Sequence, residues 1–155
     1  MLIYFAGPLF CKAEKTFNLK LTEKLEESGF SVFLPQRDGV DPNKSHYDSL
    51  TEEERFKKIF DTDRNKILQS DIFLIVLDGR VPDEGACVEL GIAYEQKCLK
   101  NKDKLLIGLK TDWRVFSSDS KLNAMIFGAL DCVLDNEVDL IQSLETYKEE
   151  CENRN

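Results

Sequence analysis

Short apolar runs alternate with amphipathic stretches along the whole chain. The apolar runs have the length of strands, and the amphipathic stretches repeat their apolar residues with the period of a helix. We expect the first four strands to be buried on both faces, because covered parallel strands read as continuous apolar runs. The predicted strands are residues 2–6, 30–34, 72–77, 105–109 and 132–134, and the predicted helices are approximately 12–28, 51–69, 84–99, 119–129 and 137–150.

Strict alternation of strand and helix predicts an α/β fold. We expect a five-stranded parallel sheet flanked by helices, in a flavodoxin-like or Rossmann-like three-layer sandwich with right-handed crossovers. The length of 155 residues suits a single domain over residues 1–155. One long polar connection, residues 36–50, holds too many turn formers for a helix. It leaves the carboxyl end of a strand, where such sheets bind ligands, so it either covers a site or is an ordinary surface loop.

Charge and hydropathy limit which kinds of molecule the chain is expected to bind. The net charge is −8, and the 21 basic residues are scattered rather than gathered into a stripe, which argues against binding to nucleic acid. The apolar runs are too short to span a bilayer, and the N-terminus lacks the pattern of a signal peptide. We therefore expect a cytoplasmic protein without membrane contact.

Few residues suit metal or triad chemistry. The five cysteines have no metal-ligand spacing and are expected to be reduced and mostly structural, and His46 is the single histidine. A zinc site or a Ser-His-Asp triad has little to build from, so we expect no metal and no cofactor. Any chemistry is expected to depend on carboxylates.

The segment DEGACVELGIAY, residues 83–94, contains two such carboxylates. Asp83 suits the N-terminal cap of a helix, where a carboxylate accepts bonds from free amides. Glu89 is unusual, since a buried carboxylate without a partner costs several kcal/mol and needs hydrogen bonds, a distant cation or a function. Its neighbours three and four positions away on the helix include no basic residue: Gly85, Ala86, Ile92 and Ala93.

Position along the elements separates the remaining candidates. Asp71 opens the third strand, so it lies at the amino edge of the sheet and is expected to have a structural role. Asp63 precedes it by eight residues of helix, a rise of about 12 Å, and so returns to the carboxyl edge. Tyr4 lies near the carboxyl end of the first strand, where its ring packs inside and its hydroxyl needs a partner. A contact between Tyr4 and Glu89 would satisfy both groups.

Four segments in order resemble the nucleoside 2-deoxyribosyltransferase family, and the likeness covers most of the chain. They are IYFAGPLF at the first strand, DRNKILQSD from Asp63 to Asp71, PDEGACVELGIAY, and LNAMIFG at residues 122–128. The resemblance implies that Glu89 is the nucleophile, that Tyr4 orients it and that Asp63 protonates the base.

The resemblance also implies a substrate site shared between subunits. Asp83 would contact the sugar, and Asn123 would come from a neighbouring subunit of a homo-oligomer, with a dimer as the smallest unit and a tetramer or hexamer as larger alternatives. At the carboxyl edge, Gly7 lies beside the substrate, Phe10 either stacks on the base or is an ordinary surface aromatic, and Gln36 reads the edge of the base.

The implied activity is exchange of nucleobases on 2′-deoxynucleosides through a covalent glutamyl-deoxyribose ester, with retention of the β configuration. The small-molecule partners would be a 2′-deoxynucleoside and a free nucleobase. Related N-glycosidases that act on nucleoside 5′-monophosphates carry serines where this chain has Asp83 and Asn123, and an arginine in place of Phe10. Because Asp83 would repel a phosphate, these residues favour nucleosides. Hydrolysis of deoxynucleosides or their 5′-monophosphates is the first alternative, and an inactive sensing domain is the second.

Overall fold

The sheet has five strands, all parallel, in the computed structural model, which describes residues 1–40, 50–100, 103–112 and 122–154. The strand order is β2-β1-β3-β4-β5, which is the flavodoxin-like order. The predicted α/β sandwich with a five-stranded parallel sheet is therefore confirmed. The strands are β1 (Leu2–Ala6), β2 (Ser31–Phe33), β3 (Ile72–Val76), β4 (Leu105–Leu109) and β5 (Cys132–Leu134).

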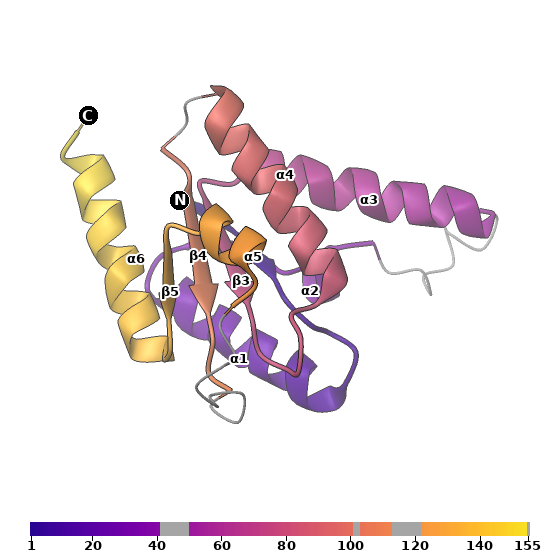
Figure 1. Cartoon of the computed structure of the whole chain (residues 1–155), viewed down its shortest axis with the longest axis horizontal. Helices are drawn as coiled ribbons and strands as arrows, with labels where there is room; N and C mark the ends of the chain where they lie inside the picture. The colour runs from indigo at the N-terminus through magenta and orange to yellow at the C-terminus, as the bar shows by residue number, and fades with distance from the viewer. Residues whose placement is uncertain (41–49, 101–102, 113–121, 155) are drawn as a thin grey trace.

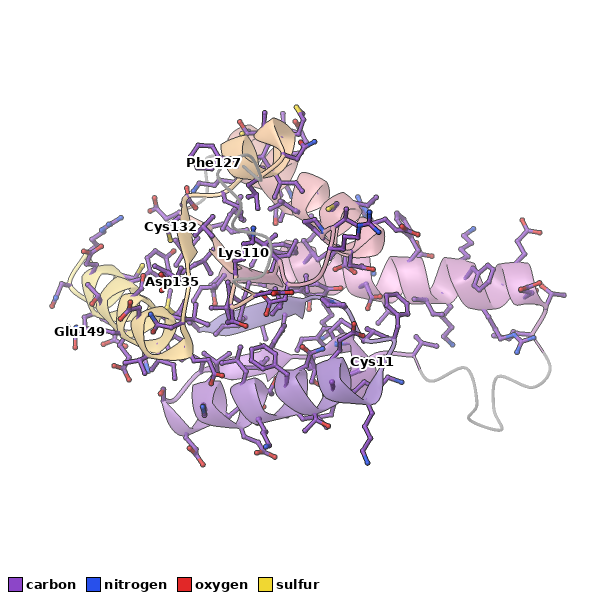
Figure 2. All side chains as sticks on the ribbon, turned by 60° about the horizontal axis from the view of Figure 1, so that its bottom comes forward. Cys11, Lys110, Phe127, Cys132, Asp135 and Glu149 are labelled. Atoms are coloured by element: carbon purple, nitrogen blue, oxygen red, sulfur yellow. The ribbon has the colours of Figure 1, made fainter. Side chains whose placement is uncertain are left out.

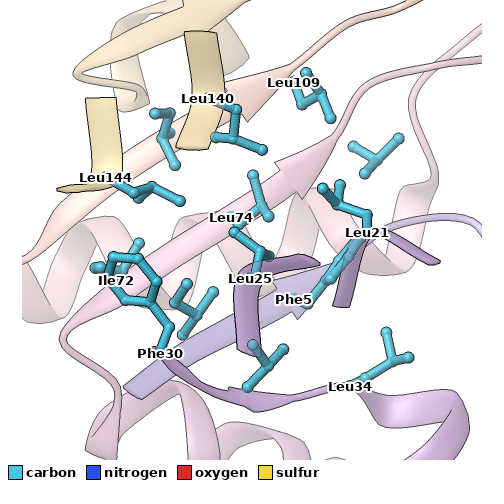
Figure 3. Close-up of a cluster of buried hydrophobic side chains, with 14 residues drawn as sticks. Phe5, Leu21, Leu25, Phe30, Leu34, Ile72, Leu74, Leu109, Leu140 and Leu144 are labelled. Atoms are coloured by element: carbon cyan, nitrogen blue, oxygen red, sulfur yellow. The ribbon is translucent and has the colours of Figure 1, made fainter. Parts of the chain in front are cut away.

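Helices cover both faces of this sheet (Figure 1). Side chains alternate between the faces along each strand, so Ile3 and Phe5 lie in one apolar cluster while Tyr4 and Ala6 lie in the other. The first cluster packs against α1 and α6 (Figure 3), and the second packs against α3, α4 and α5. The helices are α1 (Lys12–Glu27), α2 (Pro35–Asp38), α3 (Glu52–Gln69), α4 (Glu84–Lys100), α5 (Ala124–Ala129) and α6 (Glu137–Glu152).

The polar connection after β2 differs from the prediction at its start. Its first residues belong to α2, a single helical turn that was expected to be loop. Pro35 suits the first position of a helix because it needs no donor there. Asp38 accepts a bond from the amide of Leu34 at 2.9 Å, and Arg37 pairs with Glu26 of α1 at 2.8 Å, so the turn is held from both sides. Residues 41–49 of the connection lie outside the described part of the chain.

Helix α3 reaches well beyond the edge of the sheet. Its N-terminal half projects past the other elements in two views of the molecule (Figures 1 and 2). Within α3 only Ile67, near the C-terminal end, is buried. The helix begins with a capping box, in which the side chains of Thr51 and Glu54 each accept a hydrogen bond from the other's backbone amide. This capping box stabilises the N-terminal end of α3, which has no buried residue. As a result, α3 contributes an exposed apolar surface beside α4.

Candidate active site

Tyr4 of β1 contacts Glu89 of α4. The Tyr4 ring is fully buried on the face of the sheet that α3 and α4 cover, and its hydroxyl donates to Oε1 of Glu89 at 2.8 Å. The two residues are 85 positions apart, so the contact depends on the fold. Among the described residues, no cation pairs with Glu89 in an ion pair, so the tyrosine is the partner that compensates its burial.

Asp83 sets the start of the helix that carries Glu89. Its Oδ2 accepts a bond from the amide of Ala86 at 2.8 Å, as expected of an N-terminal cap. Glu89 then lies on the side of α4 that faces α3. The cap therefore fixes where α4 begins and, through the helix, where the Glu89 carboxyl lies.

A cavity of about 320 Å³ opens between α3 and α4 at Glu89. This volume is in the range of small-molecule sites, and most of the wall is apolar, as is usual for them. Asp63 of α3 and Glu89 of α4 both line it, so the structure brings the two predicted carboxyls to one cavity. The remaining lining residues are Phe56, Ile59, Phe60, Arg64, Ile67, Gly85, Val88 and Ile92.

The pKa of Glu89 rises from its ordinary 4.5 to about 7. Burial is the largest cause, the hydrogen bond from Tyr4 acts in the opposite direction, and the charges of Asp63 and Asp83 raise the value further. We expected the tyrosine to keep Glu89 ionised, but its effect is smaller than that of burial. Protonated and ionised Glu89 are therefore both populated near neutral pH. Burial also raises the pKa of Tyr4 far above its usual range, so its hydroxyl remains a donor.

Burial likewise raises the pKa of Asp63, from 3.8 to about 6. Both carboxyls thus titrate near neutral pH, as groups in catalytic sites often do. Glu89 has the higher pKa of the two, which is opposite to the order that a nucleophile and an acid require. A substrate that accepts a hydrogen bond from Asp63 would correct this order, because it stabilises the protonated form of that residue.

Three other predicted residues lie elsewhere. Phe10 is 76 % exposed and does not line the cavity. The side-chain amide of Gln36 is engaged at both ends, since its Nε2 donates to the carbonyl of Lys15 at 2.9 Å and its Oε1 accepts from Asn18 at 3.0 Å. In the folded chain these two bonds link Gln36 to α1, and reading of a base by Gln36 stays a prediction. Gly7 packs so closely that an added Cβ would lie 3.1 Å from Cβ of Val76.

Asn123 caps the short helix α5. Its Oδ1 accepts from the amide of Met125 at 2.9 Å, and its side chain is exposed. It does not line the cavity of its own chain. Phe127 of the same helix is 67 % exposed and stands on the outer surface (Figure 2).

Asp71 and Asn18 have structural positions. Asp71 accepts from the amide of Leu2 at 2.7 Å at the amino edge, which agrees with its predicted structural role. Asn18 was not predicted, and its buried amide donates to the carbonyl of Pro8 at 2.9 Å as well as to Gln36. The apolar cavity wall was also missed, although Phe56, Phe60 and Asp63 follow each other at helical spacing on α3.

Neither a cluster of metal-binding side chains nor a membrane-spanning helix is present in the described residues. Within the described residues, no group of three or more histidine, cysteine, aspartate or glutamate side chains is placed to hold a metal ion. In the same part of the chain, no helix is both long enough and apolar enough to cross a membrane.

Several known proteins share this structure. A conserved protein from Enterococcus faecalis V583 superposes with a TM-score of 0.76 at 27 % identity, covering 94 % of this chain and 98 % of its own. A 2-deoxyribosyltransferase from Bacillus psychrosaccharolyticus gives 0.72 at 21 % identity, covering 91 % and 90 %. A CMP N-glycosidase from Clostridium botulinum gives 0.56 at 18 % identity, covering 94 % and 99 %. At these identities the last two show a shared fold.

Sequence comparison identifies the family, whereas these structural similarities show the fold. No curated protein sequence is significantly similar to the chain. The sequence profile of the nucleoside 2-deoxyribosyltransferase family, however, matches residues 3–138, which include Tyr4, Asp63, Asp83, Glu89 and Asn123. The chain belongs to the nucleoside 2-deoxyribosyltransferase family.

Proposed function

We propose that this protein transfers the 2-deoxyribosyl group of a 2′-deoxynucleoside from one nucleobase to another. The hydrogen bond between Tyr4 and the partly buried Glu89, beside a cavity that Asp63 also lines, supports this proposal most. A carboxylate nucleophile that forms a covalent sugar ester has to be oriented toward the reacting carbon, and the hydrogen bond from Tyr4 orients Glu89.

The reaction has two displacements. The ionised Glu89 attacks C1′ of the deoxyribose on the side opposite the base, and the C1′–N bond breaks through an oxocarbenium-like transition state. The product is a 2-deoxyribosyl ester of Glu89. A second base then attacks C1′, the ester bond breaks and Glu89 leaves as a carboxylate. Two inversions give net retention of the β configuration.

Protons move through Asp63 in the same cycle. Protonated Asp63 donates to a ring nitrogen of the departing base and takes a proton back from the incoming one. Because the pKa values of Asp63 and Glu89 are about 6 and about 7, the pair can carry one proton near neutral pH. The hydrogen bond from Tyr4 favours the charge on Glu89, and a bond from Asp63 to the base favours the proton on Asp63. Substrate binding thereby divides the two roles.

A second copy of the chain is part of the proposal. Three apolar side chains at the cavity are largely exposed: Phe56 at 62 %, Phe60 at 52 % and Val88 at 60 %. The ester intermediate must be kept from water, and exposed apolar surface of this kind is typical of protein interfaces. A partner subunit that covers this surface would also bring its own Asn123 to the sugar. Two chains would then form each complete site.

Hydrolysis of deoxynucleoside 5′-monophosphates is the second candidate. Arg64 lines the same cavity as Glu89 and offers a guanidinium, which suits a phosphate. Asp83 opposes this reading, since its carboxylate would repel a phosphate near the sugar. The nucleoside reaction agrees with Asp83 and remains our first choice.

Product analysis separates these activities. The purified protein is incubated with deoxyinosine and adenine, and separately with deoxynucleoside 5′-monophosphates without a free base. Deoxyadenosine and hypoxanthine from the first mixture support transfer, whereas free base and sugar phosphate from the second support the hydrolase. Glu89→Ala is the control for contaminating enzymes. Near-normal turnover by this variant would refute the assignment of Glu89, and no reaction in either mixture would refute both activities.

A further inference from the structure

The ring of Tyr4 lies between two phenylalanine rings. Tyr4 pairs in register with Phe33 of β2 on one side and with Phe73 of β3 on the other. Each ring centroid is 5.7 Å from that of Tyr4, with interplanar angles of 22° to Phe33 and 6° to Phe73. These distances are typical of favourable aromatic pairs. Phe33, Tyr4 and Phe73 thus form a stack of three rings across three adjacent strands.

This three-ring stack limits the movement of the Tyr4 hydroxyl. Phe73 is fully buried on the central strand β3, and Phe33 is 7 % exposed on the edge strand β2. A tyrosine ring has two side-chain torsions, and neighbours on both of its faces restrict both of them. The hydroxyl is then held where it meets Glu89 at 2.8 Å.

We propose that Phe33 and Phe73 are positioning residues, which hold the Tyr4 phenol in the orientation that fixes the Glu89 carboxylate for attack on the sugar. Phe73 has the larger effect because its ring is nearly parallel to that of Tyr4 and lies on the central strand. The catalytic consequence rests on the proposed function, whereas the orientation of Glu89 is a property of the folded protein. The two parts can therefore be tested separately.

The first test needs no substrate. Glutamate is labelled with ¹³C at the side-chain carboxyl, and the pKa of Glu89 is measured by NMR in the wild type, Tyr4→Phe and Phe73→Leu. Tyr4 stabilises ionised Glu89, so loss of its hydroxyl should raise this pKa, and Phe73→Leu should raise it in the same direction. The other charged groups around the cavity, Asp63, Arg64 and Asp83, are not altered. An unchanged pKa in Phe73→Leu would overturn the proposal.

A matched control separates positioning from general loosening of the core. Phe5 is on the same strand as Tyr4, is 1 % exposed and packs on the opposite face of the sheet. Phe5→Leu should lower stability without moving the pKa of Glu89, and an equal rise in this variant would contradict the positioning role. Phe33→Leu provides the same test at the edge strand if Phe73→Leu does not fold. Phe33→Tyr keeps an aromatic ring beside Tyr4, so the pKa of Glu89 in this variant should equal that of the wild type.

The second test uses base exchange. Phe73→Leu should lower kcat roughly tenfold, within the range that small displacements of catalytic groups cause. In a Tyr4→Phe background the same substitution should change kcat by about twofold or less, because no hydroxyl remains to be positioned. Losses that multiply in the double variant would overturn the proposal. If no base exchange exists, the NMR test still decides the orientation of Glu89, so failure of the function and failure of the positioning are distinguishable.

Discussion

Replacing Glu89 with glutamine should stabilise the protein at alkaline pH while removing its nucleophile. The folded protein holds the Glu89 proton more tightly than the unfolded chain does, since the pKa rises from 4.5 to about 7 on folding. By linkage, Glu89 lowers the free energy of unfolding of the wild type as the pH rises from 4.5 to about 7. Above about pH 7 this loss of stability has reached its full value. Glutamine remains neutral at every pH and avoids the cost.

The size of the effect follows from the pKa. A rise from 4.5 to about 7 corresponds to about 3 kcal/mol of folding free energy at pH 8 and above. The glutamine amide has two N–H donors where the protonated acid has one O–H, so it needs a further partner in a largely buried position, and we expect a gain of about 2 kcal/mol at pH 8. For a chain of this length, that gain raises Tm by roughly 4 to 8 °C. Below about pH 4.5 Glu89 is protonated in both states, so the linkage gain is absent and the variant should be about 1 kcal/mol less stable than the wild type.

Urea unfolding of both proteins from pH 4 to pH 9 tests this expectation. Measurements share one protein concentration, since the stability of an oligomer depends on concentration. Glu95→Gln makes the same change at an exposed position of α4 and should alter stability by less than about 0.5 kcal/mol throughout. A difference between Glu89→Gln and wild type that does not change with pH, or that becomes more unfavourable as the pH rises, would refute the reasoning.

Three further outcomes follow from the site. Asp63→Asn should slow base exchange by about 10² to 10⁴-fold, the usual contribution of a general acid, and an unchanged steady-state rate would remove Asp63 from the mechanism. The pH dependence of kcat/KM should be bell-shaped, because activity falls at acid pH as Glu89 is protonated and at alkaline pH as Asp63 loses its proton; a rate that rises steadily from pH 5 to pH 9 would contradict this. Mixing the Glu89→Ala and Asn123→Ala variants should restore activity if each site uses the partner's Asn123, because one of the two sites in a mixed dimer then carries neither substitution. If activity does not recover after subunit exchange, Asn123 lies outside the site or acts within its own chain.

Local sequence patterns predicted most of the fold. Buried parallel strands read as apolar runs because both of their faces are covered, and so all five strands were found within one residue at each end. The cap at Asp83 was predicted because it needs only a helix start and a short polar side chain. The pairing of Tyr4 with Glu89 was predicted as the solution to two buried polar groups, although its geometry needed the sheet register.

Long-range contacts account for what the sequence did not predict. The turn α2 depends on the ion pair between Arg37 and Glu26, which are 11 residues apart and belong to different elements. The hydrogen bonds of Gln36 join it to partners 18 and 21 residues away. The pKa order of Asp63 and Glu89 depends on how much water each loses and on the charges around it. Pattern alone contains none of these quantities.

The cap at Asp83 allows substrate preference to change without loss of the helix. Serine caps helices about as well as aspartate does, so Asp83→Ser keeps the bond that starts α4 while it removes a negative charge. The charge of Asp83 is one of the causes that raise the pKa of Glu89, so the serine variant would also have a more acidic nucleophile. Under the proposed function, a change of this one residue would weaken the discrimination against phosphorylated sugars and lower the pKa of the Glu89 carboxyl in the same step.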